Sequence, residues 1–236
     1  DIPQTAIDSV VRIKNSSGET GCGFVIGTET LEDGEKSYTV MTNRHVAKDT
    51  GHKVTIEFWA NGYKIKTVKA ETYRSWYEGD MYIDIALVKI KRSALGFDPP
   101  VMALAERGHK IRLGDQVNTI GCPKAWWPNA RSGHITKLTK DHMYISPTSH
   151  GGDSGGPVFD RYCKRVIGLT AWRGFPPNDP ETYCGSMTAD LIRDVLEGKH
   201  GDGLPKSNSG EKAPAPRLRP FGRIWREYTP DENELK

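Results

Sequence analysis

The chain has 236 residues, a formal net charge of +3 and a hydrophobic fraction of 36%, to which 25 glycines add. This length predicts one or two domains, and the apolar share is close to that of globular domains, so the composition excludes disorder over the whole chain. No run approaches the ~18 apolar residues of a membrane span, and so small a charge does not indicate a nucleic-acid-binding face. We therefore expect no membrane span and no nucleic-acid partner.

The cysteine pattern argues against a disulfide-rich scaffold and against a zinc site. Four cysteines are sparse in a chain of this length, and no two of them form a C-x-x-C pair. Three complete pairings are possible and the sequence does not choose among them, so four free, mostly buried thiols are the simplest interpretation. We expect neither a metal nor another cofactor. The residues concerned are Cys22, Cys122, Cys163 and Cys184.

Most of the first 198 residues are predicted to form short strands. Segments rich in β-branched and aromatic residues alternate with turns, which is typical of all-β sandwiches and paired barrels. Asn61-Gly62, between 53–59 and 63–65, predicts a β-hairpin. The other predicted strands cover 9–13, 23–26, 37–42, 84–90, 116–121, 133–138, 143–145, 157–159 and 166–172, and the segment 91–108 joins the two halves.

One helix and an extended tail complete the predicted chain. Apolar residues in 188–197 share one helical face, and Gly198 can end the helix in the left-handed conformation. Residues 199–236 are rich in proline and charge, which predicts a linker or tail. Within it, 214–228 holds an apolar cluster that is a candidate for docking onto this chain or a partner. The cluster consists of Leu218, Phe221, Ile224, Trp225 and Tyr228.

The sharpest chemical signal is the segment Ser149-His-Gly-Gly-Asp-Ser-Gly-Gly-Pro-Val158. Because a serine hydroxyl is a poor nucleophile, acyl transfer needs a general base beside it and hydrogen-bond donors for the oxyanion. Glycines around Ser154 allow a tight turn that exposes backbone N–H groups. Ser154 is therefore the candidate nucleophile, and the amides of Gly152 and Ser154 are the candidate oxyanion donors.

A histidine and an aspartate in suitable local settings precede this segment. His45 follows an apolar strand in TNRHV (42–46), and Asp84 heads the apolar strand DIALVKI (84–90). The chain order His45, Asp84, Ser154 is that of chymotrypsin-type peptidases and not that of subtilisins or α/β-hydrolases. Asp80 is the alternative orienting acid. Asp84 is favoured because the apolar run that would bury its carboxylate begins directly after it.

With these motifs the chain resembles the trypsin-like (chymotrypsin-fold) serine peptidases, and within them the HtrA type. The resemblance implies two packed antiparallel β-barrels, at about 5–95 and 105–187, with a C-terminal helix at 188–197 in a peptidase domain at 1–198. The 199–236 tail is too short for the PDZ domains that HtrA proteins append, so we expect a bare peptidase domain. Besides the three motifs above, IRLGDQVNTIGCP (111–123) and SGHITKL (132–138) carry the match.

The resemblance also implies a Ser-His-Asp triad. Ser154 would attack the scissile carbonyl, His45 would carry its proton and Asp84 would orient the imidazole. In trypsins the aspartate before the nucleophile receives a newly formed N-terminal amine, whereas HtrA-type enzymes carry Asn there. Asp153 departs from the HtrA pattern, and once buried it needs a cationic or N–H partner that the sequence does not name.

By the same resemblance, a substrate pocket is expected beside the nucleophile. No acidic residue falls at its base, which disfavours a preference for Lys or Arg. Hydroxyls beside Arg173 suit an acidic or small polar residue, although glutamyl endopeptidases place a histidine where this chain has Thr170. The predicted lining residues are Thr148, Ser149, Thr170, Ala171, Trp172, Arg173 and Gly185.

Two functional hypotheses follow. The leading one is a serine endopeptidase that cleaves protein or peptide substrates through an acyl-enzyme, without metal or cofactor. The alternative is a catalytically idle or latent peptidase-fold protein that serves as a structural or binding component of a larger assembly. The chain begins at Asp1 with no leader-like segment. We expect an extracytoplasmic location, periplasmic or secreted, or assembly into a larger particle, rather than a cytoplasmic one.

Overall fold

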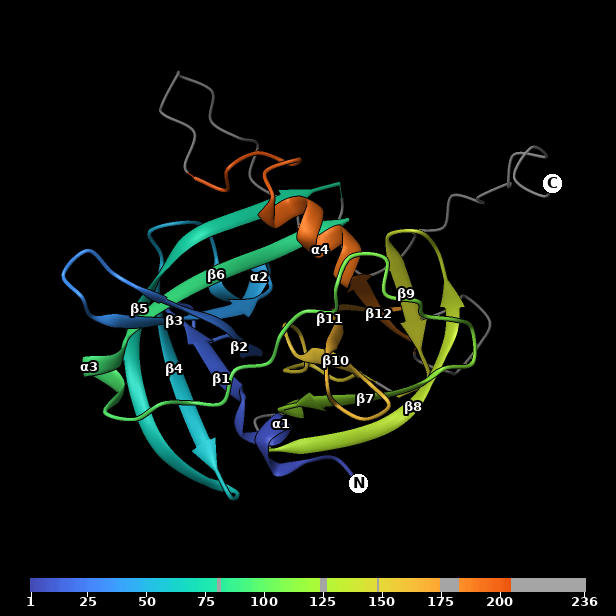
Figure 1. The fold of residues 1–236 in the computed structure, drawn as a ribbon, viewed down its shortest axis with the longest axis horizontal. Coiled ribbons are helices and arrows are strands. Elements are labelled where there is room, and N and C mark those ends of the chain that lie inside the picture. Colours follow the sequence, from blue (N-terminus) through green and yellow to red (C-terminus); the bar gives the residue numbers. More distant parts are fainter. Residues whose placement is uncertain (80–81, 124–126, 148, 175–182, 205–236) are drawn as a thin grey trace. The chain divides into compact units, whose positions relative to one another are not determined.

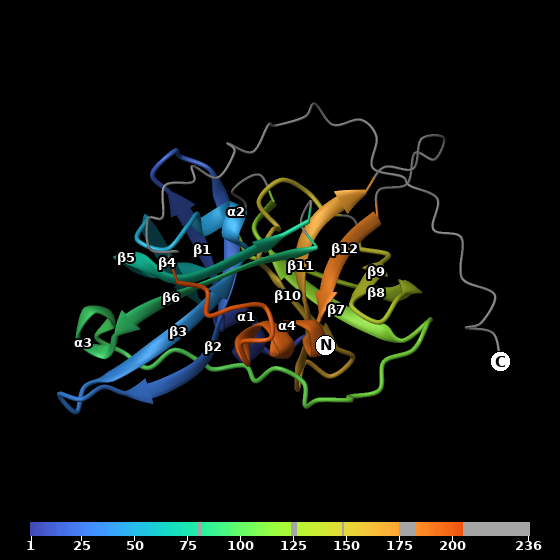
Figure 2. The same cartoon turned by 90° about the horizontal axis from the view of Figure 1, so that it is seen from above.

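The computed structural model describes residues 1–79, 82–123, 127–147, 149–174 and 183–204. Two closed barrels of antiparallel strands lie side by side in both ribbon views (Figures 1 and 2). This architecture confirms the predicted all-β fold of two barrels. No helix within the described ranges combines the length and the apolar character that crossing a membrane requires.

Each barrel contains six strands. Barrel one has the order β1-β2-β3-β6-β5-β4, and barrel two has the order β10-β11-β12-β9-β8-β7. The strands of barrel one are β1 (Val10–Asn15), β2 (Thr20–Thr30), β3 (Lys36–Thr42), β4 (Lys53–Ala60), β5 (Tyr63–Glu78) and β6 (Ile83–Lys91). Those of barrel two are β7 (Gln116–Gly121), β8 (Asn129–Leu138), β9 (His142–Ile145), β10 (Pro157–Asp160), β11 (Val166–Gly174) and β12 (Tyr183–Thr188).

The turn between β4 and β5 is the hairpin that the sequence predicts. Asn61 and Gly62 have φ values of 50° and 81°. Positive φ at both central residues is the geometry whose twist matches that of the flanking strands, and asparagine and glycine tolerate it best. Ala60 and Tyr63 close the hairpin as cross-strand partners.

Several elements extend beyond the sequence prediction. The strand predicted at 63–65 continues as β5 to Glu78, and β12 was not predicted. Half of the β5 residues are exposed, charged side chains interrupt its apolar ones, and β12 is largely polar, so neither shows the apolar pattern that indicates a strand. Three short helices were also not predicted, because single turns carry almost no periodicity: α1 (Gln4–Asp8), α2 (Arg44–Ala47) and α3 (Arg92–Leu95).

A shared hydrophobic cluster joins the two barrels. It contains Phe24 and Ile85 from barrel one, Ile120 from barrel two, and Leu191 from α4 (Ala189–Leu196). Helix α4 matches the predicted helix to within a residue at each end. Thr188 is its N-cap, and Thr188 Oγ1 accepts a hydrogen bond from the Leu191 amide at 3.4 Å. Each barrel also encloses a cluster of its own, so the seam between the barrels is a third apolar layer.

The chain after α4 returns to barrel one. The Ser75 amide on β5 donates to the carbonyl oxygen of Gly203 at 2.9 Å, and Trp76 Nε1 donates to that of Gly201 at 3.0 Å. A Cβ on Gly203 would lie 2.4 Å from the Trp76 ring, so glycine allows this close approach. The first residues of the predicted tail are thus packed on β5. The candidate docking segment 214–228 lies outside the described residues.

Candidate active site

His45 and Asp84 meet between α2 and β6. His45 lies in the helical turn of α2 directly after β3, and Asp84 is the second residue of β6. Asp84 Oδ2 lies 2.5 Å from His45 Nδ1, and Asp84 Oδ1 accepts a hydrogen bond from the His45 backbone amide at 2.9 Å. Asn43 Nδ2 donates to the Asp84 carbonyl oxygen at 2.8 Å. The carboxylate thus holds both the ring and the backbone of His45.

Burial and exposure differ between these two residues in a way that matters for proton transfer. Asp84 is fully buried, so its charge needs hydrogen bonds, and His45 supplies two of them. A carboxylate only accepts, so Nδ1 carries the proton and Nε2 of neutral His45 keeps its lone pair. The His45 side chain is 36% exposed. Its Nε2 atom can therefore accept a proton from a neighbouring group.

Ser154 lies in a tight loop between β9 and β10. The Asp153 amide donates to the His150 carbonyl oxygen, and the Gly156 amide donates to that of Asp153, each at 3.0 Å. Gly155 has a φ of +83°, and a Cβ there would lie 2.2 Å from the Cys22 carbonyl oxygen. Only glycine fits that position without displacing β2. The loop is fixed to barrel one by the Cys22 amide, which donates to the Ser154 carbonyl oxygen at 2.7 Å.

The same loop packs against the residues that precede His45. A Cβ on Gly155 would also lie 2.3 Å from Thr42 Oγ1 and 3.1 Å from the Asn43 amide nitrogen. Thr42 Oγ1 in turn donates to the Cys22 carbonyl oxygen at 2.6 Å. The fold therefore brings the segment of Ser154 to the segment of His45 at the seam between the barrels. The alternative acid, Asp80, lies outside the described residues.

The two candidate oxyanion donors are available. Gly152 has a φ of +105°, a backbone conformation that other residues rarely adopt. Within the described part of the chain, no protein group accepts a hydrogen bond from the amide of Gly152 or of Ser154. Unused backbone N–H groups beside a nucleophile are what an oxyanion requires.

Asp153 is paired with a residue that sequence reasoning missed. Arg131 Nη2, on β8, lies 2.6 Å from Asp153 Oδ2, and the His150 amide donates to the same oxygen at 2.8 Å. The side chain of Asp153 is 4% exposed and that of Arg131 is 20% exposed. A Cβ on Gly121 would lie 2.1 Å from Asp153 Oδ1, so glycine there makes room for the carboxylate. Arg131 supplies the cationic partner that the sequence analysis required and did not name.

No local pattern identifies Arg131 in the sequence. It lies in a mostly polar, largely exposed strand, and the pairing of β8 with β7 brings it to the loop that carries Asp153 and Ser154. The need of a buried Asp153 for a cation does not single out one arginine or lysine of barrel two. The ion pair is a product of tertiary structure.

The predicted pocket residues fall into three groups. Ser149 and Thr170 are buried beside a small cavity of about 10 Å³, roughly the space for one water. Ala171 is buried, and Gly185 on β12 pairs with Trp172 on β11. The side chains of Trp172 and Arg173, and the whole of Thr148, lie outside what the structure describes. Arg131 and Cys184 also line the cavity and were not predicted to do so.

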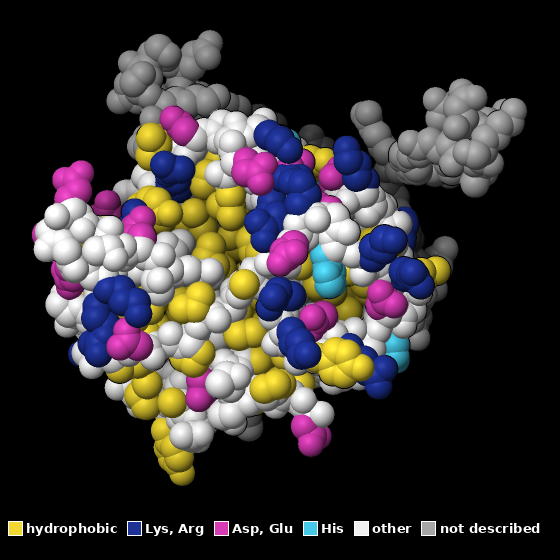
Figure 3. Space-filling model, viewed as in Figure 1, with side chains coloured by type: hydrophobic (Ala, Val, Ile, Leu, Met, Phe, Trp, Pro, Cys, Tyr) yellow, Lys and Arg dark blue, Asp and Glu magenta, His cyan; other side chains and the backbone are white. Residues whose placement is uncertain are grey.

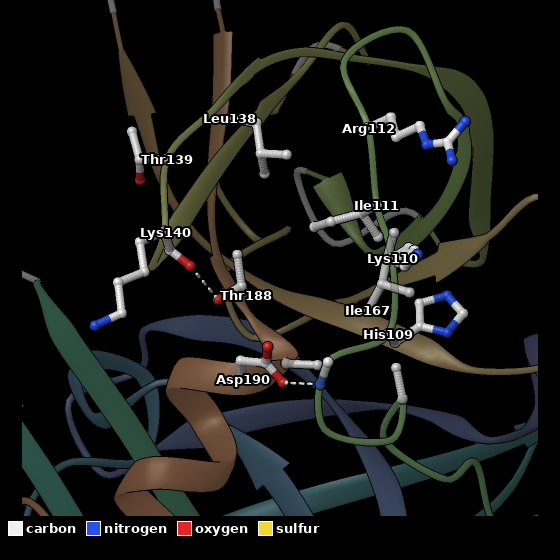
Figure 4. Close-up of a pocket in the computed structure, with 13 residues that line it drawn as sticks. His109, Lys110, Ile111, Arg112, Leu138, Thr139, Lys140, Ile167, Thr188 and Asp190 are labelled. Carbon is white, nitrogen blue, oxygen red and sulfur yellow. Dashed lines mark hydrogen bonds between the residues drawn. The ribbon is translucent and has the colours of Figure 1, made fainter. Parts of the chain in front are cut away.

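A larger cavity, of about 400 Å³, lies elsewhere in barrel two, at the start of α4 (Figure 4). None of the predicted site residues lines it. Its walls combine apolar and basic side chains from the 105–112 segment, from the end of β8 with the turn that follows it, and from β11. They include Ile111, Leu138, Ile167, Lys110, Arg112 and Lys140.

Charge and metal-ligand patterns do not point to a second chemistry. On the face shown in Figure 3, Lys and Arg side chains are interspersed with Asp and Glu side chains. Within the described ranges, no group of three or more His, Cys, Asp or Glu side chains is arranged to hold a metal ion.

Comparison with known proteins places this geometry in a family. Residues 21–169 match the family model described as the trypsin-like peptidase domain. The chain belongs to the trypsin-like peptidase family. This membership confirms the resemblance inferred from the motifs, and it implies protein or peptide substrates. A search among curated proteins finds no significant match.

Solved structures show the same fold as this trypsin-like peptidase. Rv3671c of M. tuberculosis H37Rv, in an inactive form with a serine replaced by alanine, has a TM-score of 0.61 and 25% identity, covering 86% of this chain and 91% of that chain. The serine endoprotease of Yersinia pestis has a TM-score of 0.61 and 21% identity, covering 84% of this chain and 67% of that chain. The second likeness supports the fold alone.

Proposed function

We propose that this trypsin-like peptidase is an active serine endopeptidase with Ser154 as nucleophile, His45 as general base and acid, and Asp84 as the orienting carboxylate. The contact between Asp84 and His45 carries the proposal. The Asp84 carboxylate is fully buried and uses both oxygens to hold His45, which fixes the tautomer and the position of that histidine. The candidate oxyanion amides of Gly152 and Ser154 support the same assignment.

The proposed reaction proceeds in two halves. Ser154 Oγ attacks the scissile carbonyl carbon while its proton passes to His45 Nε2, and the Gly152 and Ser154 amides donate to the oxyanion. The C–N bond then breaks, His45 gives its proton to the leaving amine, and an acyl-enzyme remains. Water repeats the attack with His45 again as base, which releases the acid. Loss of one oxyanion donor costs about 10²–10³-fold in kcat in such enzymes.

Arg131 supports an active site that forms without a new N-terminal amine. In this proposal the guanidinium balances the buried charge of Asp153, and the ion pair keeps the loop that carries Gly152 and Ser154 in one conformation. Because Arg131 is part of the folded chain, the proposed site does not depend on cleavage of the chain to generate the cation.

For specificity, we propose a small or polar side chain at the residue before the scissile bond. Ser149 and Thr170 line a cavity of about 10 Å³, which leaves little room for a long or aromatic side chain. Profiling with peptide libraries tests this point. A preference for large aromatic residues would contradict it.

Labelling with a fluorophosphonate probe tests the proposed function. We expect labelling of the unmodified chain and of His52→Ala, an exposed histidine of barrel one that serves as the matched control. Ser154→Ala and His45→Ala should not label although they keep the same circular dichroism spectrum. Internal cleavage of an unfolded protein substrate, read by mass spectrometry, tests the endopeptidase activity.

The alternative hypothesis gives the opposite result. A folded, unmodified chain that neither labels nor cleaves would refute the proposed activity and favour an idle peptidase fold that acts as a structural or binding component.

A further inference from the structure

Two cysteines face each other across the seam between the barrels. Cys22 lies on β2 of barrel one, and Cys122 directly follows β7 of barrel two. Both are fully buried, and both are free thiols. Their Sγ atoms are 2.8 Å apart, only about 0.8 Å longer than the ~2.0 Å of a disulfide bond. This separation makes the pair a candidate for direct oxidation.

Both thiols also contact the loop between β9 and β10 that carries Gly152 and Ser154. Cys22 Sγ and Cys122 Sγ each lie 3.2 Å from the carbonyl oxygen of Gly152, within hydrogen-bond range for sulfur. Among the described residues, no other group donates to that oxygen. Each thiol has one proton to donate, and Cys122 Sγ also lies 3.4 Å from the Gly21 carbonyl oxygen, so the two S–H groups are shared among these acceptors and the partner sulfur. Within the described residues they are the donors in reach of the Gly152 carbonyl oxygen, while the Gly152 amide is a proposed oxyanion donor.

The protonation state of Cys22 fits a donor role. Burial and the hydrogen bond with Cys122 raise the pKa of the Cys22 thiol well above its usual value. The thiol therefore stays protonated in neutral solution and keeps its S–H group. Because the thiolate is the reactive form, the same environment makes oxidation slow at neutral pH and faster as the pH rises.

We propose that Cys22 and Cys122 form an oxidisable pair. When reduced, the pair positions the loop that carries Gly152 and Ser154, and when joined as a disulfide it disturbs the position of that loop. Peroxides are the class of oxidant that we infer. The role in positioning rests on the proposed peptidase function, whereas the formation of the disulfide does not. The pair lies beside the reacting groups without touching substrate, so these are positioning residues.

The proposed oxidation balances with one peroxide molecule. One thiolate attacks a peroxide oxygen, the O–O bond breaks, and a sulfenic acid forms while the other oxygen leaves as water. The second sulfur then attacks the sulfenic sulfur, the S–O bond breaks, and a second water leaves. Two S–H groups and hydrogen peroxide thus give one S–S bond and two waters. The two sulfurs lose two electrons, and the peroxide gains them.

Oxidation changes the site in two ways. Both S–H protons leave, so the Gly152 carbonyl oxygen loses its donors while it stays buried among the same residues. The sulfurs must also approach by about 0.8 Å, which shifts β2 against the end of β7. We expect a loss of roughly tenfold in kcat, smaller than the 10²–10³-fold cost of removing an oxyanion donor itself.

Treatment of the purified, reduced chain with hydrogen peroxide tests the proposal. Intact mass should fall by two hydrogen atoms, and peptide mapping should find Cys22 joined to Cys122. The probe-labelling rate and kcat should fall about tenfold with little change in KM, and dithiothreitol should restore them. Cys163→Ala, which removes a buried thiol outside the pair, should respond as the unmodified chain does, and Cys22→Ala should form no cross-link.

A second pair of variants separates hydrogen bonding from packing. Replacing both cysteines by serine keeps two O–H donors near Gly152 and should retain most of kcat without any response to peroxide. Replacing both by alanine removes the donors and should lower kcat about tenfold. Equal activity of the serine and alanine variants would refute the positioning role.

The outcomes separate this inference from the proposed function. Absence of the cross-link after prolonged peroxide treatment at alkaline pH overturns the oxidisable pair, whatever the activity. A cross-link with unchanged kcat overturns its influence on the loop. If the reduced chain labels with no probe, the proposed function fails, yet a mapped Cys22–Cys122 cross-link still establishes the oxidisable pair.

Discussion

Replacing Arg131 by methionine tests whether the buried ion pair between Arg131 and Asp153 holds the loop of Gly152 and Ser154 in its conformation. Methionine keeps much of the apolar stem and removes the charge. Asp153, with a side chain only 4% exposed, would then keep one hydrogen-bond donor among the described residues, the His150 amide at 2.8 Å. We expect both lower stability and slower labelling, because the uncompensated carboxylate must move toward water and take Ser154 with it.

The burial of the pair sets the size of the effect. Breaking a buried ion pair by removing one partner costs about 3–5 kcal/mol, and the 20% exposure of Arg131 favours the lower end of that range. About 3 kcal/mol lowers the Tm of a domain of this size by about 6–12 °C. Movement of the loop should also reduce the rate of fluorophosphonate labelling by roughly 10²-fold, the effect of losing an oxyanion donor.

Urea unfolding and labelling kinetics measure the two effects on the same preparation. Arg12→Met is the matched control, because Arg12 pairs with Glu57 at 2.9 Å within barrel one and its side chain has a similar exposure of 21%. The control should lose some stability and label at the normal rate. Combining Arg131→Met with Asp153→Asn removes the stranded charge, and we expect this double variant to recover most of the lost stability.

Two results would refute the reasoning. If Arg131→Met labels at the normal rate, the ion pair is not needed to hold the loop of Gly152 and Ser154 in its conformation. If the double variant is no more stable than the single one, the cost does not come from the unpaired Asp153 carboxylate.

Three further predictions concern single residues. Asp84→Asn should fold normally and lose about 10⁴-fold in labelling rate or kcat, and a loss under tenfold would reject Asp84 as the orienting acid. Gly155→Ala places a Cβ 2.2 Å from the Cys22 carbonyl oxygen at a φ of +83° and should abolish labelling, whereas Gly151→Ala, with open space around its Cβ, should label nearly normally. Burial lowers the pKa of His142, so the stability that its neutral form contributes is complete above about pH 6.5 and is lost as the pH falls. Between about pH 7.5 and 5.5, the Tm of His142→Gln should therefore fall less than the Tm of the unmodified chain. An equal fall of Tm in both proteins would contradict this.

Local sequence patterns located the strands that carry the motifs and suggested the chemistry of those motifs. Apolar alternation and turn residues located β3, β6 and the hairpin at Asn61-Gly62, since each signal is local. The motifs around His45, Asp84 and Ser154 named the candidate triad for the same reason: each residue type stands in a short segment whose own chemistry is informative. The long strand β5 and the polar strand β12 gave no such signal and were missed in whole or in part.

The residues that support that site follow from the packing of distant segments. Arg131 reaches Asp153 because β8 pairs with β7, and Cys22 faces Cys122 because two separate barrels pack against each other. The two cysteines are 100 residues apart in the chain. Contacts between distant segments depend on barrel closure and register, which local periodicity does not specify. The candidate reacting groups are therefore identified by short motifs, while the groups that hold them in place depend on packing between distant segments.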